Sequence, residues 1–445
     1  MKKTSIFQTL VLIFSGIFAI IALIIFSMYK GSGEEKLQPV TIWGTIPSDS
    51  FDRLAIELRE NDEITESIDH VTYIEKNINT FDSEFVEALA IGAGPDLVVL
   101  PHERILRQRN KLIPISYDTY SERSFQDSFI EGADILRDEN GIYAFPLSVD
   151  PMVMYWNRDM FTSSLITEAP KTWESVISIA PKLSVTDDTG SVFKSAVALG
   201  QFSNVDYAKE ILTTLIKQAG GDVVTKLVEQ SDGRTPGQDF DITYIPSLNK
   251  RGEYLTPPAE AALRFFGQFT DPTREVYSWN KSLNSDSQRF LSGDLAMYFG
   301  KSSRYEDFKK ISPNLNFDVA PIPQKTGTTP VTYGDFMGIS IVKNSQKVPD
   351  AFQTLIVITR PEVANILSSI IDLPPARRDV LSQSQSSAHI ETFYSSAVWA
   401  KSFFDPYPEQ TDEVFGDMIG LYTTGQSGVG ESIDVANSKL EIIYE

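Results

Sequence analysis

The segment GIYAFPLSVDPMVMYWNRD, residues Gly141 to Asp159, carries the main signal about the architecture of the chain. It predicts a short strand, a bend marked by Pro146, and a second apolar run from Met152 to Trp156. One acid, Asp150, lies in the polar part between them. Both flanks are strand-like and the connection is short, which favours an extended crossing between two compact units. An ordinary strand–turn–strand inside one domain fits the same residues.

The residues before this segment alternate between strand and helix patterns. Helices end where glycine and proline follow, as at Gly92–Pro95,. A β-α-β-α-β order indicates an open α/β sheet, in which ligands collect at the carboxyl ends of strands. That rule points to Trp43–Thr45 and Pro101–Arg104. The predicted strands are Val40–Trp43, His70–Ile74 and Asp96–Leu100, and the helices between them are Asp49–Arg59 and Phe81–Leu89.

The residues after the segment predict a second mixed unit. Thr172 is placed to cap a helix at its start, and residues 230–251 are polar enough to indicate a surface insertion. Further helices are predicted at Tyr207–Gln218, Pro258–Phe269, Pro349–Thr359, Thr411–Tyr422 and Gly430–Ile442, and strands at Val197–Leu199, Leu295–Phe299, Phe317–Ala320 and Gly338–Val342.

Length and composition bound the class of protein. A chain of 445 residues is too long for one core, so at least two lobes are expected,. The 39 basic and 60 acidic residues give a net charge of −21, and there is no basic tract for nucleic acid to bind,. The sequence contains no cysteine, which excludes disulfides, thiol catalysis and a lipid attached to cysteine.

The first 30 residues predict a membrane anchor. Lys2 and Lys3 precede an uncharged, mostly apolar run from Ile6 to Met28, long enough to span a bilayer,. The lysines should stay in the cytoplasm, so the bulk of the chain should lie on the extracellular or periplasmic side. A convincing cleavage site is absent. An uncleaved anchor over residues 1–30, followed by a linker over 31–38, is expected, with a cleaved signal peptide as the alternative.

Signals for an enzyme are weak. The three histidines are widely spaced without a zinc pattern, and no nucleophile elbow or phosphate loop occurs,. Neither a metal nor a cofactor is expected. Aromatic residues recur instead where strands end, beside polar residues, which is the combination that sugar recognition requires. Taken singly, each aromatic is more often part of a core. The aromatics are Trp43, Trp156, Phe202, Phe299, Tyr333 and Phe336, and the polar neighbours are Glu103, Asp150, Asn204, Lys301 and Asp335.

Several segments, in order, resemble the extracellular solute-binding proteins of ABC importers, family 1, in the sugar-binding branch that includes maltose-binding protein. They are GPDLVVL (Gly94–Leu100), PLSVDPMVMYWNRDMF (Pro146–Phe161), PKTWESV (Pro170–Val176), FLSGDLAMYFGKS (Phe290–Ser302), YGDFMGISIVKNSQKVPDAFQTLIVIT (Tyr333–Thr359), LPPARRDV (Leu373–Val380) and AKSFFDPYPEQTDEVF (Ala400–Phe415).

The resemblance implies a two-lobed α/β fold of the periplasmic-binding-protein type II, with hinge crossovers, preceded by one transmembrane helix. The chain would cross between lobes near Pro146–Pro151, Ala320–Gln324 and Leu373–Arg377. Lobe 1 would then comprise residues 39–147 and 324–373, and lobe 2 residues 148–323 and 374–445.

The resemblance also places the ligand contacts. Two departures from the family pattern stand out: Ser303 and Arg304 occupy the place where many relatives carry a tryptophan, and a helix must replace a lipid anchor. The expected ligand-binding residues are Trp43, Gly44, Thr45, His102, Glu103, Asp150, Phe202, Asn204, Gly300, Lys301, Ser302, Tyr333, Gly334, Asp335 and Phe336.

The expected protein is therefore a monomeric, membrane-anchored receptor that hands a small polar ligand, above all a sugar or oligosaccharide, to an ABC permease. Two alternatives stay open: a sensory or adhesion receptor of the same fold without transport, and a surface glycoside-processing enzyme.

Overall fold

The computed structural model describes residues 37–60, 68–188, 190–231, 239–383, 385 and 387–445. The chain divides into two units, Met1–Pro39 and Val40–Glu445, and the described helices and strands all belong to the second. The predicted anchor over residues 1–30 and residues 31–36 of the predicted linker lie outside the described residues. Among the described helices, none alone is long and apolar enough to cross a bilayer. A pair bent by 70°, Val348–Ile358 and Pro361–Ile371, meets that criterion when taken together.

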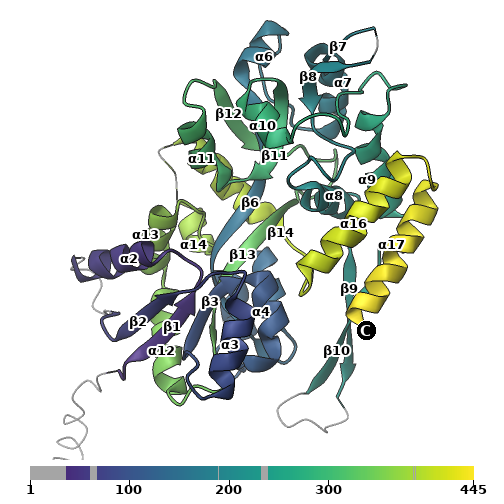
Figure 1. Ribbon diagram of the computed structural model, residues 1–445. Helices are drawn as coiled ribbons and strands as arrows, with labels where there is room; N and C mark the ends of the chain where they lie inside the picture. The colour runs from purple at the N-terminus through teal and green to yellow at the C-terminus, as the bar shows by residue number, and fades with distance from the viewer. Residues whose placement is uncertain (1–36, 61–67, 189, 232–238, 384, 386) are drawn as a thin grey trace, which may run out of the picture. The chain divides into compact units, whose positions relative to one another are not determined.

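One long strand, β6 (Phe145–Asn157), lies in the middle of the second unit (Figure 1). Its first half pairs antiparallel with β13 (Thr332–Ile341), and its second half pairs with β11 (Leu295–Lys301) and β12 (Phe317–Pro321). The extended crossing expected from the sequence is therefore present.

Pro146 does not separate two strands as predicted, because β6 runs through it with a bulge. Pro146 lies inside β6 opposite Gly338, and the register shifts between Met337 and Gly338 so that Leu147 is an extra residue. Proline is tolerated at such a bulge because the ladder is already interrupted there.

Ten of the described strands form one sheet with the order β2-β1-β3-β13-β6-β11-β8-β7, in which β12 pairs with β6 and β14 with β13. The other four form two separate pairs, β9 with β10 and β4 with β5. The predicted N-terminal β-α-β-α-β unit is confirmed, because β1 pairs parallel with both β2 and β3. The remaining strands are β1 (Val40–Gly44), β2 (Val71–Glu75), β3 (Leu97–Pro101), β4 (Arg137–Asp138), β5 (Gly141–Ile142), β7 (Val185–Thr186), β8 (Val192–Val197), β9 (Val224–Gln230), β10 (Phe240–Pro246) and β14 (Ala400–Lys401).

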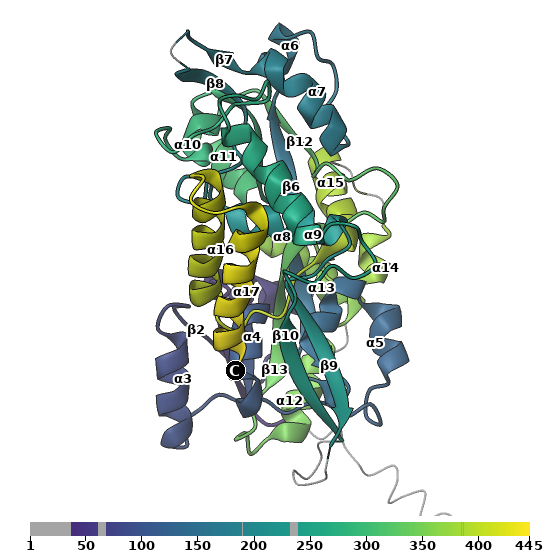
Figure 2. The ribbon, with the colours of Figure 1, turned by 90° about the vertical axis from the view of Figure 1, so that its right-hand side faces the viewer.

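Helices cover both faces of this sheet (Figures 1 and 2). The first half of the chain contains α2 (Ser48–Glu60), α3 (Phe81–Ala90), α4 (His102–Gln108), α5 (Glu122–Ser128), α6 (Arg158–Ser163), α7 (Trp173–Leu183) and α8 (Ala208–Gln218), with short 3-10 helices η1 (Arg109–Lys111) and η2 (Glu131–Leu136). The second half contains α9 (Pro258–Gly267), η3 (Gln268–Thr270), α10 (Asp286–Leu291), α11 (Arg304–Ile311), α12 (Val348–Ile358), α13 (Pro361–Ile371), α14 (Arg378–Leu381), α15 (Ala388–Trp399), α16 (Pro408–Thr423) and α17 (Val429–Tyr444).

Local sequence signals account for several of these boundaries. The Thr172 side chain accepts a hydrogen bond from the Ser175 backbone N–H and caps α7, as predicted,. Helix α3 ends at Ala90, shortly before Gly92, whose φ of +72° favours glycine,. The apolar stripe of α2 is buried as its helical spacing requires,.

Two hydrophobic cores lie along the sheet. Residues of β6 up to Val149 belong to the first core, and residues from Met152 onward belong to the second. The same change occurs on β13, where Phe336 belongs to the first core and Tyr333 to the second. We call the parts built around these cores the first and second lobes. Helix α15 contributes side chains to both cores.

The polar segment at residues 230–251 was predicted to be a surface insertion, and part of it instead forms regular β-structure. Its regular part belongs to an antiparallel hairpin of β9 and β10 that starts in the second lobe. The hairpin contacts the first lobe at Asn140, whose side chain exchanges three hydrogen bonds of 3.0 Å with the backbone of Asp239 and Phe240. Cross-strand pairing compensates for the few apolar contacts that the composition offers.

Candidate functional site

Two aspartates face each other where the chain passes from one core to the other. Asp150 on β6 lies opposite Asp335 on β13 in the antiparallel register, so both side chains are on the same face of the sheet,. Like charges in this position repel each other. Asp150 Oδ1 accepts hydrogen bonds from Ser302 Oγ at 2.8 Å and from the Ser303 backbone N–H at 3.0 Å. These bonds tie the end of β11 to the crossing strand.

Lys301, at the end of β11, supplies a positive charge between these acids. Its ammonium group forms an ion pair with Asp335 and lies 4.0 Å from the Glu210 carboxylate. It also lies 5.2 Å from the centre of the Tyr207 ring. Burial alone would raise the pKa of Asp335, but the neighbouring basic groups, Lys301 first among them, together outweigh that effect and hold the pKa below its ordinary value. Burial acts to lower the pKa of Lys301, and the neighbouring carboxylates raise it instead.

His102 begins α4 directly after β3 and is completely buried. Its Nε2 lies 2.7 Å from Ser402 Oγ, which donates a hydrogen bond to the Tyr333 hydroxyl at 3.1 Å. Its Nδ1 accepts a hydrogen bond from the Phe336 backbone N–H at 3.3 Å. Burial lowers the pKa of His102 to about 4, so the ring is neutral at physiological pH and joins β3, β13 and the segment before α16,.

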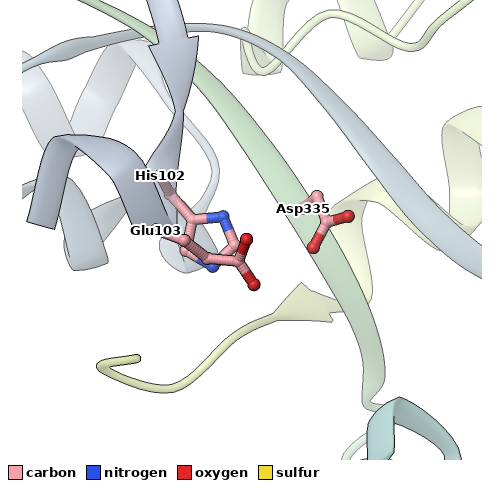
Figure 3. A group of neighbouring side chains, drawn as sticks. All are labelled: His102, Glu103 and Asp335. Carbon is pink, nitrogen blue, oxygen red and sulfur yellow. The ribbon is translucent and has the colours of Figure 1, made fainter. Parts of the chain in front are cut away.

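Glu103, the next residue of α4, is the acid with the fewest partners. Within the part of the chain that the structure describes, no hydrogen bond or ion pair holds its carboxylate. One of its oxygens lies within 4.8 Å of ligand atoms on His102 and Asp335, and the three side chains converge on one space (Figure 3). Burial and the charge of Asp335 raise the pKa of Glu103 to about 8.

A second lysine sits beside this group. Lys209 on α8 is buried, lies 3.1 Å from Asp405 and 2.6 Å from Asp412, and its charge acts on Glu103 together with that of Asp405. Burial raises the pKa of the neighbouring Glu210. We call these groups the interlobe cluster: the carboxylates of Glu103, Asp150, Glu210, Asp335 and Asp405 and the ammonium groups of Lys209 and Lys301.

The cluster includes one set of residues whose types could bind a metal ion. His102, Glu103 and Asp335 offer nitrogen and oxygen atoms at ligand spacing,. Both nitrogens of His102 are already engaged in hydrogen bonds, however, and one Asp335 oxygen is paired with Lys301, so few ligand atoms remain for a metal ion. These residues therefore do not fit a resident metal ion.

Most of the predicted binding residues lie in or beside the cluster. Two glycines among them are required by close packing: a Cβ on Gly300 would collide with the Tyr298 ring, and one on Gly334 would lie 2.7 Å from Ala400. The residues that the structure brings together are His102, Glu103, Asp150, Gly300, Lys301, Ser302, Tyr333, Gly334, Asp335 and Phe336.

The residues at the end of β1 have other neighbours. Lys76 lies 3.9 Å from the centre of the Trp43 ring, and Gly44 packs against Tyr73. The Thr45 hydroxyl is buried without a hydrogen-bond partner among the described residues,. No hydrogen bond or ion pair of the described chain links these three residues to the cluster, and their role as ligand contacts stays a prediction.

Phe202 and Asn204 have their neighbours within the second lobe, and their role as ligand contacts stays a prediction. Phe202 packs against α16, where a Cβ on Gly416 would lie 3.0 Å from its ring. The Asn204 side chain donates to the carbonyls of Asn280 and Leu283 at 3.0 Å and accepts from the Trp279 indole at 3.0 Å. All three bonds fix one loop, so the amide has no donor left for a solute.

Sequence reasoning missed a set of ionic contacts that joins the lobes. Arg104 and Arg107 on α4 both pair with Asp82 on α3, in the first lobe, and with Glu409 on α16, in the second. Arg107 also donates to the Pro406 carbonyl at 2.7 Å. We call this network the interlobe clasp. The only signal for it in the sequence was the position of Arg104 after β3, at a predicted ligand-facing strand end.

Comparison with known proteins fits this architecture. Residues 67–392 match the model of the bacterial extracellular solute-binding protein family. A cyclo/maltodextrin-binding protein complexed with maltotetraose shares 17% identity and a TM-score of 0.69, with 92% of this chain and 98% of that chain covered.

Two further solved structures share the fold. One is a cyclic α-maltosyl-1,6-maltose binding protein from Arthrobacter globiformis, at 15% identity and a TM-score of 0.71, covering 91% of this chain and 98% of that one. The other is a maltose/maltodextrin-binding domain from Bdellovibrio bacteriovorus bound to maltotriose, at 15% identity and a TM-score of 0.61, covering 91% and 99%.

The predicted two-lobed fold is thus confirmed for the described part of the chain. The family is one of binding proteins, which confirms the prediction of a non-enzymatic role and argues against a glycoside-processing enzyme. Since the family match extends over well over half of the sequence, this chain belongs to the bacterial extracellular solute-binding protein family.

Proposed function

We propose that this protein is a membrane-anchored extracellular receptor that binds a small polar solute, in first place a sugar or oligosaccharide, and delivers it to an ABC importer. The observation that carries the proposal is the convergence of polar side chains from both lobes at the point where β6 and β13 pass from the first hydrophobic core to the second. A solute that contacts both lobes stabilises the closed arrangement relative to the open one, and a permease can distinguish the closed form by its different surface.

The chemistry of the interlobe cluster supports a polyhydroxyl ligand. Carboxylates accept hydrogen bonds from hydroxyl groups, and the Glu103 carboxylate, which lies beside His102 and Asp335, has no hydrogen bond or ion pair within the described chain,. Proteins of the same fold are described as bound to maltotetraose, maltotriose and mannotriose. Another is an ABC transporter solute-binding protein bound to α-D-tagatose. These likenesses support the ligand class and the importer, which belong to the proposal.

The lobe boundaries and the anchor belong to the same proposal. Lobe 1 would comprise residues 39–147 and 324–373, and lobe 2 residues 148–323 and 374–445, with residues from 376 to 400 also packing against the first core. The anchor would be residues 1–30, with the lysines in the cytoplasm. A cell fraction washed at alkaline pH tests it: the full-length chain should stay with the membranes, and its release would contradict an integral anchor.

A thermal-shift screen tests the ligand class. The full-length protein, in a detergent without a sugar head group, would be heated with sugars, oligosaccharides, amino acids, peptides and polyamines. A ligand at 100 times its dissociation constant adds about 2.7 kcal/mol of stability, which is readily measured. Stabilisation by a saccharide is expected, and Asp150→Asn should reduce it. Stabilisation by another class alone would contradict the sugar, and none at all would contradict a small-solute receptor.

A further inference from the structure

The interlobe cluster has more acids than bases. It contains five carboxylates against two ammonium groups, and each ammonium group already has partners: Lys301 has Asp335, and Lys209 has Asp405 and Asp412. The guanidinium groups nearby do not restore the balance. Arg104 and Arg107 pair with Asp82 and Glu409 in the clasp, and Arg304 pairs with Asp307 at 3.1 Å within its own helix.

The excess negative charge is concentrated at Glu103. Its carboxylate comes within 4.8 Å of the Asp335 carboxylate without a cation of its own, and the two point into the same space (Figure 3). Two carboxylates this close repel each other when both are ionised, which favours a proton or a positive charge at one of them. The pKa of Glu103 is raised accordingly, by burial and by the Asp335 charge.

The side chains around Glu103 and Asp335 restrict which kind of charged group could bind between these two carboxylates. A metal ion is disfavoured because too few ligand atoms remain for it: both ring nitrogens of His102 are engaged in hydrogen bonds and one Asp335 oxygen is paired with Lys301. An anionic solute would meet the same carboxylates and be repelled. An ammonium group suits this position for two reasons. It carries the positive charge that the carboxylates lack, and it can donate three hydrogen bonds to oxygens on different elements.

We propose that the solute of this protein bears an ammonium group, which binds between the carboxylates of Glu103 on α4 and Asp335 on β13. Combined with the proposed function, on which this part rests, the solute is an aminated saccharide. The ammonium group would bridge α4 of the first lobe and β13, and it would lie beside Lys301 of the second lobe. Its binding would therefore depend on the position of the two lobes relative to each other.

The expected selectivity is large because a hydrogen bond to a charged group is worth more than a neutral one. Replacing the ammonium group by a hydroxyl should weaken binding by about ten- to a hundred-fold. Replacing it by an acetamide of the same sugar should do the same, since the charge is lost in both cases.

Isothermal titration calorimetry with three matched oligosaccharides tests the inference. The probes are glucosamine, N-acetylglucosamine and glucose oligomers of the same length and linkage, with spermidine as an ammonium compound that is not a sugar. The full-length protein is used in a detergent without a sugar head group. The glucosamine oligomer should bind at least tenfold more tightly than the other two. In Glu103→Gln that ratio should fall towards one.

Glu362→Gln is the matched control, because Glu362 is exposed on α13 of the first lobe and loses the same charge far from the cluster. It should keep the wild-type ratio, and an unchanged melting temperature for Glu103→Gln would show that the variant is folded.

The outcomes separate the inference from the proposed function. A neutral oligosaccharide that binds as tightly as its aminated counterpart overturns the inference and leaves the sugar receptor standing. Binding of spermidine without any saccharide supports the ammonium site and overturns the saccharide. If no ammonium compound binds, or if Glu103→Gln keeps the wild-type ratio, the inference is wrong.

Discussion

The interlobe clasp should shift the balance between open and closed lobes, and Glu409→Gln isolates its contribution. Glu409 is the only acid of the second lobe, within the described chain, that pairs with both Arg104 and Arg107. The substitution keeps the size of the side chain and removes its charge. Asp82 keeps the two arginines paired inside the first lobe, so neither is left with an unmatched buried charge.

The size of the effect follows from exposure. The Glu409 side chain is 61% exposed, so solvent screens both of its ion pairs. Exposed pairs contribute about 0.2–1 kcal/mol each, and two of them give about 1 kcal/mol. That corresponds to about a fivefold change in the ratio of closed to open protein. The stability of the lobes themselves should change little.

Single-molecule energy transfer in the ligand-free protein measures this ratio. Because the chain has no cysteine, Glu87→Cys on α3 and Gln426→Cys after α16 would be the only labelling sites. Both positions are exposed. Glu409→Gln should lower the closed-to-open ratio about fivefold at low salt. At 1 M salt the Debye length falls to about 3 Å and the difference should almost disappear.

Glu413→Gln is the control, since Glu413 is exposed one turn further along α16 and takes no part in the clasp. Equal closed fractions in the two variants at low salt would refute the reasoning. So would a difference that persists at 1 M salt, because a screened ionic contact cannot produce it.

Three further predictions test the buried contacts. Lys301→Met leaves the Asp335 charge uncompensated and should lower the free energy of unfolding by about 3–5 kcal/mol, with partial recovery on adding Asp335→Asn, as measured by urea denaturation. Asn140→Ala removes three hydrogen bonds to the hairpin and should speed amide exchange in β10,; unchanged exchange would mean that the hairpin is held elsewhere. Because the pKa of Glu103 rises from 4.5 to about 8 on folding, the folded chain binds an extra proton between these values. The stabilisation that this proton gives the folded protein is complete below about pH 4.5 and is lost as the pH rises to about 8. Glu103→Gln should therefore flatten the pH dependence of the melting temperature. An unaltered slope would contradict the assignment.

The parts of the fold that sequence predicted well are those set by local periodicity and caps. The stripe of α2, the end of α3 near Gly92 and the Thr172 cap depend on residues within a few positions of each other. Pairing between distant strands was harder to foresee. Pro146 marked a bend by its usual preference, but pairing with β13 keeps it inside a strand,.

The candidate site shows the same limit. Strand-end reasoning found Glu103, Asp150 and Asp335, because the ends of neighbouring strands meet at one edge. It could not find Lys209 or Asp405, which reach the cluster from helix α8 and from a loop before α16. Strand-end reasoning also places Asn204 at the ligand. Hydrogen bonds to a loop 76 residues further along the chain engage its amide, and its role as a ligand contact stays a prediction.

The most direct test of the central claim is the distance between the lobes with and without a solute. The full-length protein labelled at Glu87→Cys and Gln426→Cys would be titrated with the saccharide that stabilises it most in the thermal screen. If the solute binds between the lobes, the inter-label distance should shorten to one population, and Asp150→Asn should require more solute to reach it. A saccharide that stabilises the protein but leaves the distance distribution unchanged would contradict closure around a ligand at the interlobe cluster.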